Sequence, residues 1–189
     1  MVPPTATAST PPWTELEADE KRQRLLDVAT EVFTEQGLEA PMPRIAAAAG
    51  IGIGSLYRSY GSKEDLVAAL LIRQLDLLRD EISAAGERAD AWTAIEGSVR
   101  GIAERQATNK LLSGALGLTS ERRDVVVSLG EVSLAWQELL DRARDEGTVR
   151  SDATVKDIRF LFAAARAADE VEEGGRDRVI DLLLEALRR

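Results

Sequence analysis

Residues 41–63 read PMPRIAAAAGIGIGSLYRSYGSK, and this stretch predicts two short helices joined by a glycine-containing turn. Pro43 suits only a helix start, because its ring fixes φ and removes the N–H. An alanine-rich first helix is expected over residues 44–49 and ends at Gly50, where a left-handed backbone is usual. A second helix is expected over residues 54–60. This layout is typical of a helix-turn-helix, whose second helix reads DNA.

The charge of this stretch differs from that of the rest of the chain. Residues 40–63 hold three basic side chains and no Asp or Glu, whereas the 189-residue chain holds 24 basic and 33 acidic residues, a net charge of −9. A surface without acids in so acidic a chain is a candidate site for a polyanion. Three cations are a weak footprint, however, and an alanine-rich helical pair can lack acids by chance. Charge alone leaves both interpretations open.

The order of motifs from residue 21 to residue 70 resembles the N-terminal domain of the TetR family of bacterial transcriptional regulators. The matching motifs are RLLDVA (24–29), VF (32–33), EQG (35–37), IA (45–46), AGI (49–51), GSLYR (54–58) and SKEDL (62–66). Each motif is common alone, but the ordered set is specific and covers about a quarter of the chain. The resemblance implies a ligand-responsive transcriptional regulator, in particular a repressor. It would bind a palindromic operator in double-stranded DNA as a homodimer and be released by an unknown small-molecule effector.

The resemblance also implies which residues contact DNA. Candidate DNA-binding residues are Arg22, Arg44, Ile53, Gly54, Ser55, Tyr57, Arg58, Ser59, Ser62 and Lys63. Lys63 matches the phosphate-binding lysine of the family, and Ser55 offers a hydroxyl and a backbone N–H near a helix start. Arg22 either contacts a phosphate or belongs to a solvated helix face. Ser62 is also expected to cap the helix that follows.

Two departures from the family pattern weaken the expected contacts. Ser59 stands where the family often has His, and Pro41 stands where a capping Thr is frequent. Few side chains can read bases directly, because within this stretch only Arg44 and Arg58 carry a guanidinium that can form a bidentate contact with guanine. Modest specificity is therefore expected, helped by two half-sites about 34–36 Å apart.

The fold class expected is all-α, with an N-terminal three-helix helix-turn-helix DNA-binding domain and a C-terminal helical ligand-binding and dimerisation bundle. Residues 1–17 are expected to be a disordered arm, residues 18–66 the DNA-binding domain, and residues 67–189 the C-terminal domain. Apolar periodicity predicts a first helix over residues 18–36, with Phe33 as its central core residue, and a longer one over residues 63–85 that ends at Gly86. Further helices are expected over residues 89–107, 109–118, 120–146, 154–172 and 176–188.

The last two predicted helices are unusually apolar, so they are either buried inside the monomer or paired with their copies in a second subunit. The resemblance favours the second interpretation. The predicted dimer interface is Ile158, Leu161, Phe162, Ala165, Ile180, Leu183, Leu184 and Leu187. The predicted ligand pocket is Trp92, Glu104, Leu111, Leu112, Leu116, Trp136 and Phe160, although each of these side chains also suits an ordinary core or surface position.

The missing residue types narrow the function further. The chain has no Cys and no His, so no cofactor, no metal site and no enzyme activity are expected. An enzyme would need a carboxylate pair facing one cavity, such as Glu104 with Glu131 or Asp169. The spacing of these residues in the sequence does not indicate that they form such a pair. A second alternative is a helical small-molecule-binding or interaction module that has lost operator binding. No apolar run approaches the ~20 residues of a membrane span, and residues 1–13 do not read as a signal peptide, so a cytoplasmic, bacterial location without a membrane partner is expected.

Overall fold

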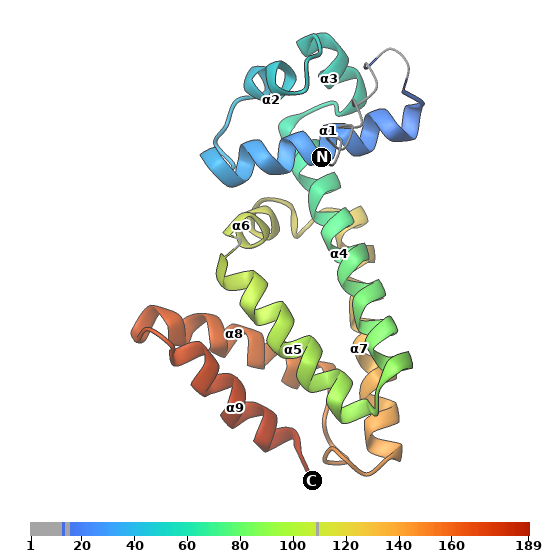
Figure 1. The fold of residues 1–189 in the computed structure, drawn as a ribbon, viewed down its shortest axis with the longest axis vertical. Helices are drawn as coiled ribbons and strands as arrows, with labels where there is room; N and C mark the ends of the chain where they lie inside the picture. The colour runs from blue at the N-terminus through green and yellow to red at the C-terminus, as the bar shows by residue number, and fades with distance from the viewer. Residues whose placement is uncertain (1–12, 14–15, 109) are drawn as a thin grey trace, which may run out of the picture. The chain divides into compact units, whose positions relative to one another are not determined.

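The computed structural model describes Trp13, residues 16–108 and residues 110–189, apart from the side chains of residues 107–113. Within these residues it contains nine α-helices and no β-strand, which confirms the all-α fold (Figure 1). Most of the predicted N-terminal arm lies outside the described residues. The last two residues of the predicted arm are packed against the fold. Leu16 is only 8% exposed, and the Glu17 backbone N–H donates to Glu20 Oε2 at 2.8 Å at the start of the first helix.

The chain divides into two compact units, with the boundary between Leu66 and Val67. The first unit contains three helices and the start of a fourth, which continues into the second unit. These helices are α1 (Ala18–Gln36), α2 (Met42–Ala48), α3 (Ile53–Ser59) and α4 (Lys63–Arg88).

The core of the first unit forms where the apolar periodicity placed it. Phe33 of α1 is 2% exposed, and Ile45 of α2 and Leu56 of α3 are fully buried. Gly37 follows α1 at φ +76°, a left-handed conformation that favours glycine. α4 begins with a cap, because the Asp65 backbone N–H donates to Ser62 Oγ at 3.0 Å.

The second unit is a bundle organised around α5. Its helices are α5 (Ala91–Thr108), α6 (Lys110–Thr119), α7 (Arg123–Asp145), α8 (Val155–Val171) and α9 (Gly175–Leu187). α5 contacts each of the other four, and its Ile95 and Val99 are fully buried. α8 and α9 pack side by side along their length (Figure 1). No helix in the described part of the chain is both long and apolar enough to cross a membrane.

The predicted end of α4 at Gly86 is wrong, because the helix continues to Arg88. The reason lies on α7, where the Arg142 guanidinium donates to the carbonyl oxygens of Gly86 and Ala89. Glu146 holds Arg142 Nε at 3.0 Å and also accepts from the Ala91 backbone N–H at 3.0 Å. These contacts satisfy carbonyl groups that a helix end leaves without partners and tie the end of α4 to α7.

The start of α8 is fixed by Asp157, as the predicted capping box requires. Asp157 Oδ2 accepts from the Thr154 backbone N–H at 2.7 Å and from its hydroxyl at 2.9 Å, and Arg150 Nη2 lies 3.0 Å from Oδ1. Burial raises the pKa of Asp157, but the hydrogen bonds from Thr154 and the charge of Arg150 outweigh it, so the pKa lies below its ordinary value.

We expect Asp157→Asn to lower the unfolding free energy at pH 7 by about 1 kcal/mol, through loss of the cap. The folded-state pKa is below the unfolded one of about 3.9, so the carboxylate stabilises the fold above about pH 4, and this contribution disappears as pH falls through the folded-state pKa. Thermal melts followed by circular dichroism from pH 3 to pH 7 should therefore show the difference from wild type shrinking in acid. Asp152→Asn is the matched control, because the Asp152 side chain is 77% exposed. An equal loss for both variants would contradict the assignment.

Candidate nucleic-acid interface

The two short helices of residues 42–59 form the predicted helix-turn-helix. Pro41 precedes α2 and Pro43 is its second residue, so the helix begins two residues earlier than expected. Gly50 ends α2 at φ +68°, as predicted. The Ile51 backbone N–H then donates to the Ala46 carbonyl at 3.0 Å, which closes the turn. Gly52 precedes α3 in an extended conformation.

α3 is anchored on one side and free on the other. Leu56 is fully buried, and Tyr60, just beyond the helix, is 3% exposed. The guanidinium carbon of Arg22, on α1, lies 5.7 Å from the centre of the Tyr60 ring, so this arginine stacks beside the helix-turn-helix while remaining exposed. Because one face of α3 is fixed against the core, its opposite face is presented outward.

The structure brings the predicted DNA-binding residues onto the surface of one unit. Tyr57 is 47% and Ile53 40% exposed. The other exposed members of the set are Arg22, Arg44, Gly54, Arg58 and Ser59, and the half-buried ones are Ser55, Ser62 and Lys63. None of these side chains belongs to the buried core.

Three donors of the serines in this set, namely the Ser55 N–H and the Ser59 and Ser62 hydroxyls, already have acceptors within the fold. The Ser55 backbone N–H donates to the Gly52 carbonyl at 2.8 Å, so it is not free for a phosphate, contrary to the expectation. The Ser59 hydroxyl donates to the Ser55 carbonyl at 3.1 Å, and the Ser62 hydroxyl donates to Asp65 Oδ2 at 2.8 Å. Each bond forms because α3 starts at Ile53 and α4 starts at Lys63. The side-chain donors that remain for DNA include the phenol of Tyr57, the Ser55 hydroxyl and the cationic side chains.

Arg58 is held in place by its own helix. Its Nη2 donates to Ser55 Oγ at 2.8 Å, one turn back along α3. A Cβ added to Gly54 would lie 3.8 Å from Arg58 Nη1, so the guanidinium extends over the bare backbone of Gly54. Ser55, Gly54 and Arg58 thus form one connected group on the exposed side of α3.

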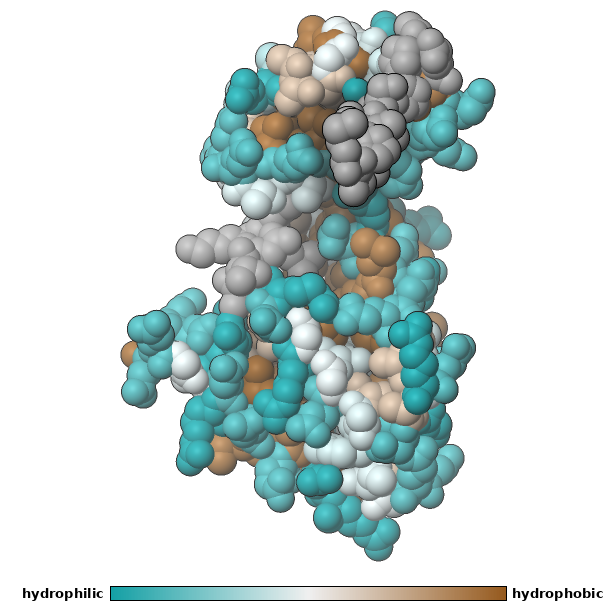
Figure 2. Space-filling model, viewed as in Figure 1, coloured by the Kyte–Doolittle hydropathy of each residue, from teal (hydrophilic) through white to brown (hydrophobic). Residues whose placement is uncertain are grey.

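The surface around this group carries no acid from residue 40 to residue 63. Figure 2 shows pale and brown side chains over α2 and α3, with few of the teal, hydrophilic ones that cover much of the remaining drawn face. A phosphate approaching α3 therefore meets Arg44, Arg58 and Lys63 without a nearby carboxylate on the same stretch. This arrangement suits contact with a nucleic-acid backbone.

The structure does not bring the predicted ligand pocket together. Trp92 and Trp136 are buried, but Glu104 is exposed and Phe160 is 68% exposed, which contradicts a place for either inside an apolar cavity. Leu116 is half-buried. The side chains of Leu111 and Leu112 lie outside the described residues. The sequence could not separate these positions, because apolar side chains line cores and pockets alike.

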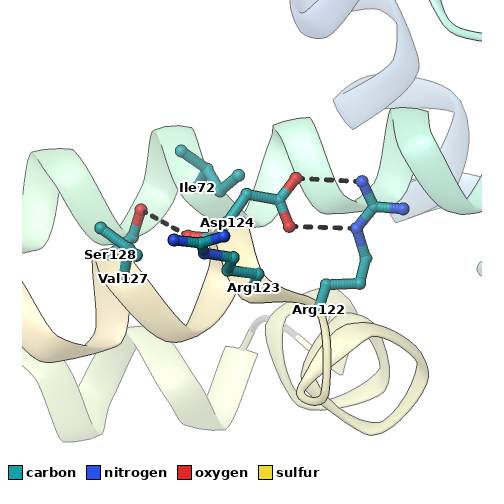
Figure 3. Close-up of a pocket in the computed structure, with 6 residues that line it drawn as sticks. All are labelled: Ile72, Arg122, Arg123, Asp124, Val127 and Ser128. Carbon is teal, nitrogen blue, oxygen red and sulfur yellow. Dashed lines mark hydrogen bonds and ion pairs between the residues drawn. The ribbon is translucent and has the colours of Figure 1, made fainter.

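A cavity of about 640 Å³ that is wide open to solvent lies between α4 and the start of α7 (Figure 3). Its lining residues are Ile72, Arg122, Arg123, Asp124, Val127 and Ser128. Arg122 Nε and Nη2 donate to the two oxygens of Asp124 at 3.2 and 3.0 Å, which lowers the pKa of Asp124. No sequence signal marked this place, because its apolar and charged residues come from two helices far apart in the chain.

The predicted dimer-interface residues prove to be mainly part of the monomer core. Each of those that lie on the α8–α9 contact is at most 3% exposed, namely Ile158, Leu161, Ala165, Ile180, Leu184 and Leu187. Phe162 and Leu183 are half-buried. On α8, the sequence shows two apolar stripes and does not show which one meets α9, so the prediction fell on the stripe of Ile158, Leu161 and Ala165. On α9, the strongest apolar stripe is the one that packs against α8. The outward stripe of α8 contains Phe160, Ala163, Ala167 and Val171, and none of these is in the predicted interface, because Phe160 is assigned to the predicted ligand pocket.

Comparison with known proteins agrees with this geometry. Residues 25–70 match the family model for "Bacterial regulatory proteins, tetR family", and residues 90–189 match that for "Transcriptional regulator SbtR-like, C-terminal domain". The HTH-type transcriptional repressor KstR2 of Rhodococcus jostii is 35% identical over 163 residues, 78% of each protein. The solved TetR transcriptional regulator SCO0520 from Streptomyces coelicolor is 27% identical with a TM-score of 0.66, covering 88% of this chain and 98% of that one. The ketosteroid transcriptional regulator KstR2 of Mycobacterium tuberculosis has the same fold, with 21% identity and a TM-score of 0.62 over 92% and 97% of the two chains.

An outward-facing helix-turn-helix followed by a separate helical unit defines a DNA-binding transcriptional regulator. The chain belongs to the TetR family of bacterial transcriptional regulators.

Proposed function

We propose that this regulator is a homodimeric repressor that binds a palindromic operator through α2, α3 and the start of α4, and that a small-molecule effector releases it. The observation that carries the proposal is the exposed, acid-free surface of residues 40–63, with Arg44, Arg58 and Lys63 on it. The R. jostii relative is itself named a repressor. In this proposal residues 18–66 bind DNA, and residues 67–189 bind the effector and the second subunit.

The outer faces of α8 and α9 support dimerisation. On α8, Phe160, Ala163, Ala167 and Val171 recur at helical spacing and are exposed, with Val171 87% exposed. On α9, Leu182 is 55% exposed. A groove of about 180 Å³ is lined by the apolar Phe160, Leu161, Leu183, Ala186 and Leu187 and by the charged pair Arg150 and Asp157. An apolar face of this extent suits a second copy of the same helix pair, with two-fold symmetry.

We expect Phe160→Asp combined with Leu182→Asp to convert the dimer to a monomer at micromolar concentration, because both charges would be buried without partners. Size-exclusion chromatography with light scattering gives the mass directly. Leu134→Asp is the matched control, because Leu134 is 63% exposed on α7, outside this face. A double variant that keeps the dimer mass would rule out this interface.

The cavity between α4 and α7 supports an effector site within the second unit. Its volume, about 640 Å³, suits a small organic molecule. Ile72 places α4 in its wall, and α4 is the helix that begins at Lys63. A ligand there shifts the regulator away from its DNA-binding form only by its different affinity for the two forms. Fused-ring apolar compounds are the first class to test, because the related KstR2 from M. tuberculosis is described as a ketosteroid regulator.

Fluorescence anisotropy with labelled DNA from upstream of the regulator's own gene tests the proposal. We expect saturable binding whose logarithm falls linearly with the logarithm of salt concentration, and loss of binding with effectors that raise the melting temperature. Absence of salt-sensitive binding at low salt, with melting still raised by ligands, would favour a small-molecule-binding module that does not regulate transcription.

A further inference from the structure

The buried Leu56 fixes which side of α3 faces outward, and the residues opposite Leu56 on the helix form the central line of that outward face. Leu56 is fully buried, and residues two positions away on a helix lie about 200° around the axis. Gly54 and Arg58 therefore stand opposite Leu56, on the line of α3 that projects farthest from the core. Ser55 and Tyr57 lie to its two sides, about 100° from Leu56.

Only one side chain stands on this central line, because Gly54 has none. The floor of the major groove carries the base edges and its rims carry the phosphates, so a central residue meets bases and flanking residues meet backbone. Tyr57 and Ser55 are thus placed toward the rims, whereas Arg58 is placed toward the floor.

Arg58 is also held before DNA arrives. Among the described residues its guanidinium has one hydrogen bond, the 2.8 Å bond from Nη2 to Ser55 Oγ. An arginine has five N–H donors in a planar fork, so four remain for a ligand. Restricting a long side chain beforehand reduces the conformational entropy lost on binding. Within the described part of the chain this guanidinium forms no ion pair with a carboxylate, so its charge is available to DNA.

We propose that Arg58 is the residue that reads a guanine in each half-site, through the guanine O6 and N7 atoms, with Ser55 as its positioning residue. This inference rests on the proposed DNA-binding function. Guanine is the base indicated, because it presents two acceptors side by side in the major groove, and the bidentate arginine fork matches them. Adenine and cytosine each present an amino donor there, which would face the guanidinium donors.

Selection of binding sites from a randomised DNA library locates the guanine. Wild-type protein should select a guanine at one fixed position in each half-site, and Arg58→Ala should lose the preference at that position only. Arg58→Lys keeps the charge, so it should keep the salt dependence while losing most of the preference. Ser55→Ala should weaken the preference partly. Arg88→Ala is the control, because it removes an exposed cation from the last turn of α4, outside the candidate DNA-binding residues, and should leave the guanine preference intact.

Replacement of the selected guanine by 7-deazaguanine tests the contact at the level of one atom. The loss of N7 removes one of the two hydrogen bonds and should weaken wild-type binding by about 10- to 100-fold per half-site, the range for one hydrogen bond to a charged group. The same replacement should have little effect on Arg58→Ala, as expected when both changes remove one interaction. Melting curves of each variant show that the chain remains folded.

The possible failures are distinct. If Arg58→Ala weakens binding equally on all sequences and retains the guanine preference, Arg58 is a phosphate contact and the inference is overturned. If 7-deazaguanine weakens wild type and Arg58→Ala equally, another residue reads that base, which also overturns it. If wild-type protein binds no DNA under any condition, the proposed function itself fails.

Discussion

Replacing Lys63 with glutamate will lower operator affinity by roughly 100-fold or more, since hydrogen bonds to charged groups are worth about 1.5–3 kcal/mol each and a dimer loses two. Lys63 is the first residue of α4, where the helix dipole stabilises a negatively charged side chain. The variant should therefore melt at the same temperature as wild type or slightly above it. Loss of binding then reflects loss of contact with DNA and not loss of the fold.

Anisotropy titrations across a range of salt concentrations measure this effect. The slope of affinity against salt should fall by about two for the dimer, one for each lost phosphate contact. Arg88→Glu is the matched control, because it makes the same charge change at the exposed far end of the same helix. If the two variants lose affinity equally, the effect is one of net charge, and Lys63 makes no specific contact.

The second large effect is expected at Gly175, the first residue of α9. An added Cβ would lie 2.6 Å from the carbonyl oxygen and 3.1 Å from the carbonyl carbon of Ala168 on α8. Such a contact cannot form, and the obstacle is helix backbone, so α9 must move away from α8. We expect Gly175→Ala to cost about 1–3 kcal/mol, the range for an overpacked core, and to lower the melting temperature by several degrees.

Gly97→Ala is the matched control for this prediction. Gly97 lies in α5, is exposed, and has open space around an added Cβ. Alanine there should stabilise the chain by about 0.5–1 kcal/mol, because it is the better helix former. Thermal melts followed by circular dichroism compare the two. A Gly175→Ala variant as stable as Gly97→Ala would mean that α8 and α9 approach each other less closely than the structure shows.

Local rules predicted much of the DNA-binding unit. Phe33 is buried as the apolar periodicity required, and Gly50 has the positive φ that the end of α2 required. All helices were found, with ends within three residues of those predicted. These features depend on neighbours within one or two turns of the chain, so the sequence alone carries the information.

The misses depend on contacts between distant segments. Gly86 looked like a helix end, but Arg142, 56 residues later, satisfies its carbonyl and the helix continues. Periodicity showed that α8 is apolar on more than one side, but only the packing against α9 separates Ile158 from Phe160. The α4–α7 cavity joins Ile72 to residues 122–128, and no local pattern links them. Among the DNA-binding candidates, the Ser55 N–H expected to contact a phosphate is bonded to the Gly52 carbonyl instead, because α3 starts one residue earlier than predicted.

The hydrogen bonds from Arg142 fix the C-terminal end of α4, so any tilt of this helix would pivot near Arg88. A helix of 26 residues is about 39 Å long at 1.5 Å per residue. A tilt of about 5° at the fixed end then displaces Lys63 by roughly 3 Å, nearly the 3.4 Å spacing of successive base pairs. Ile72, in the wall of the proposed effector cavity, lies about 24 Å from Arg88 along the helix, so the same tilt moves it by about 2 Å. In the proposed function, an effector that displaces α4 by this amount at Ile72 would move Lys63 by nearly one base-pair step.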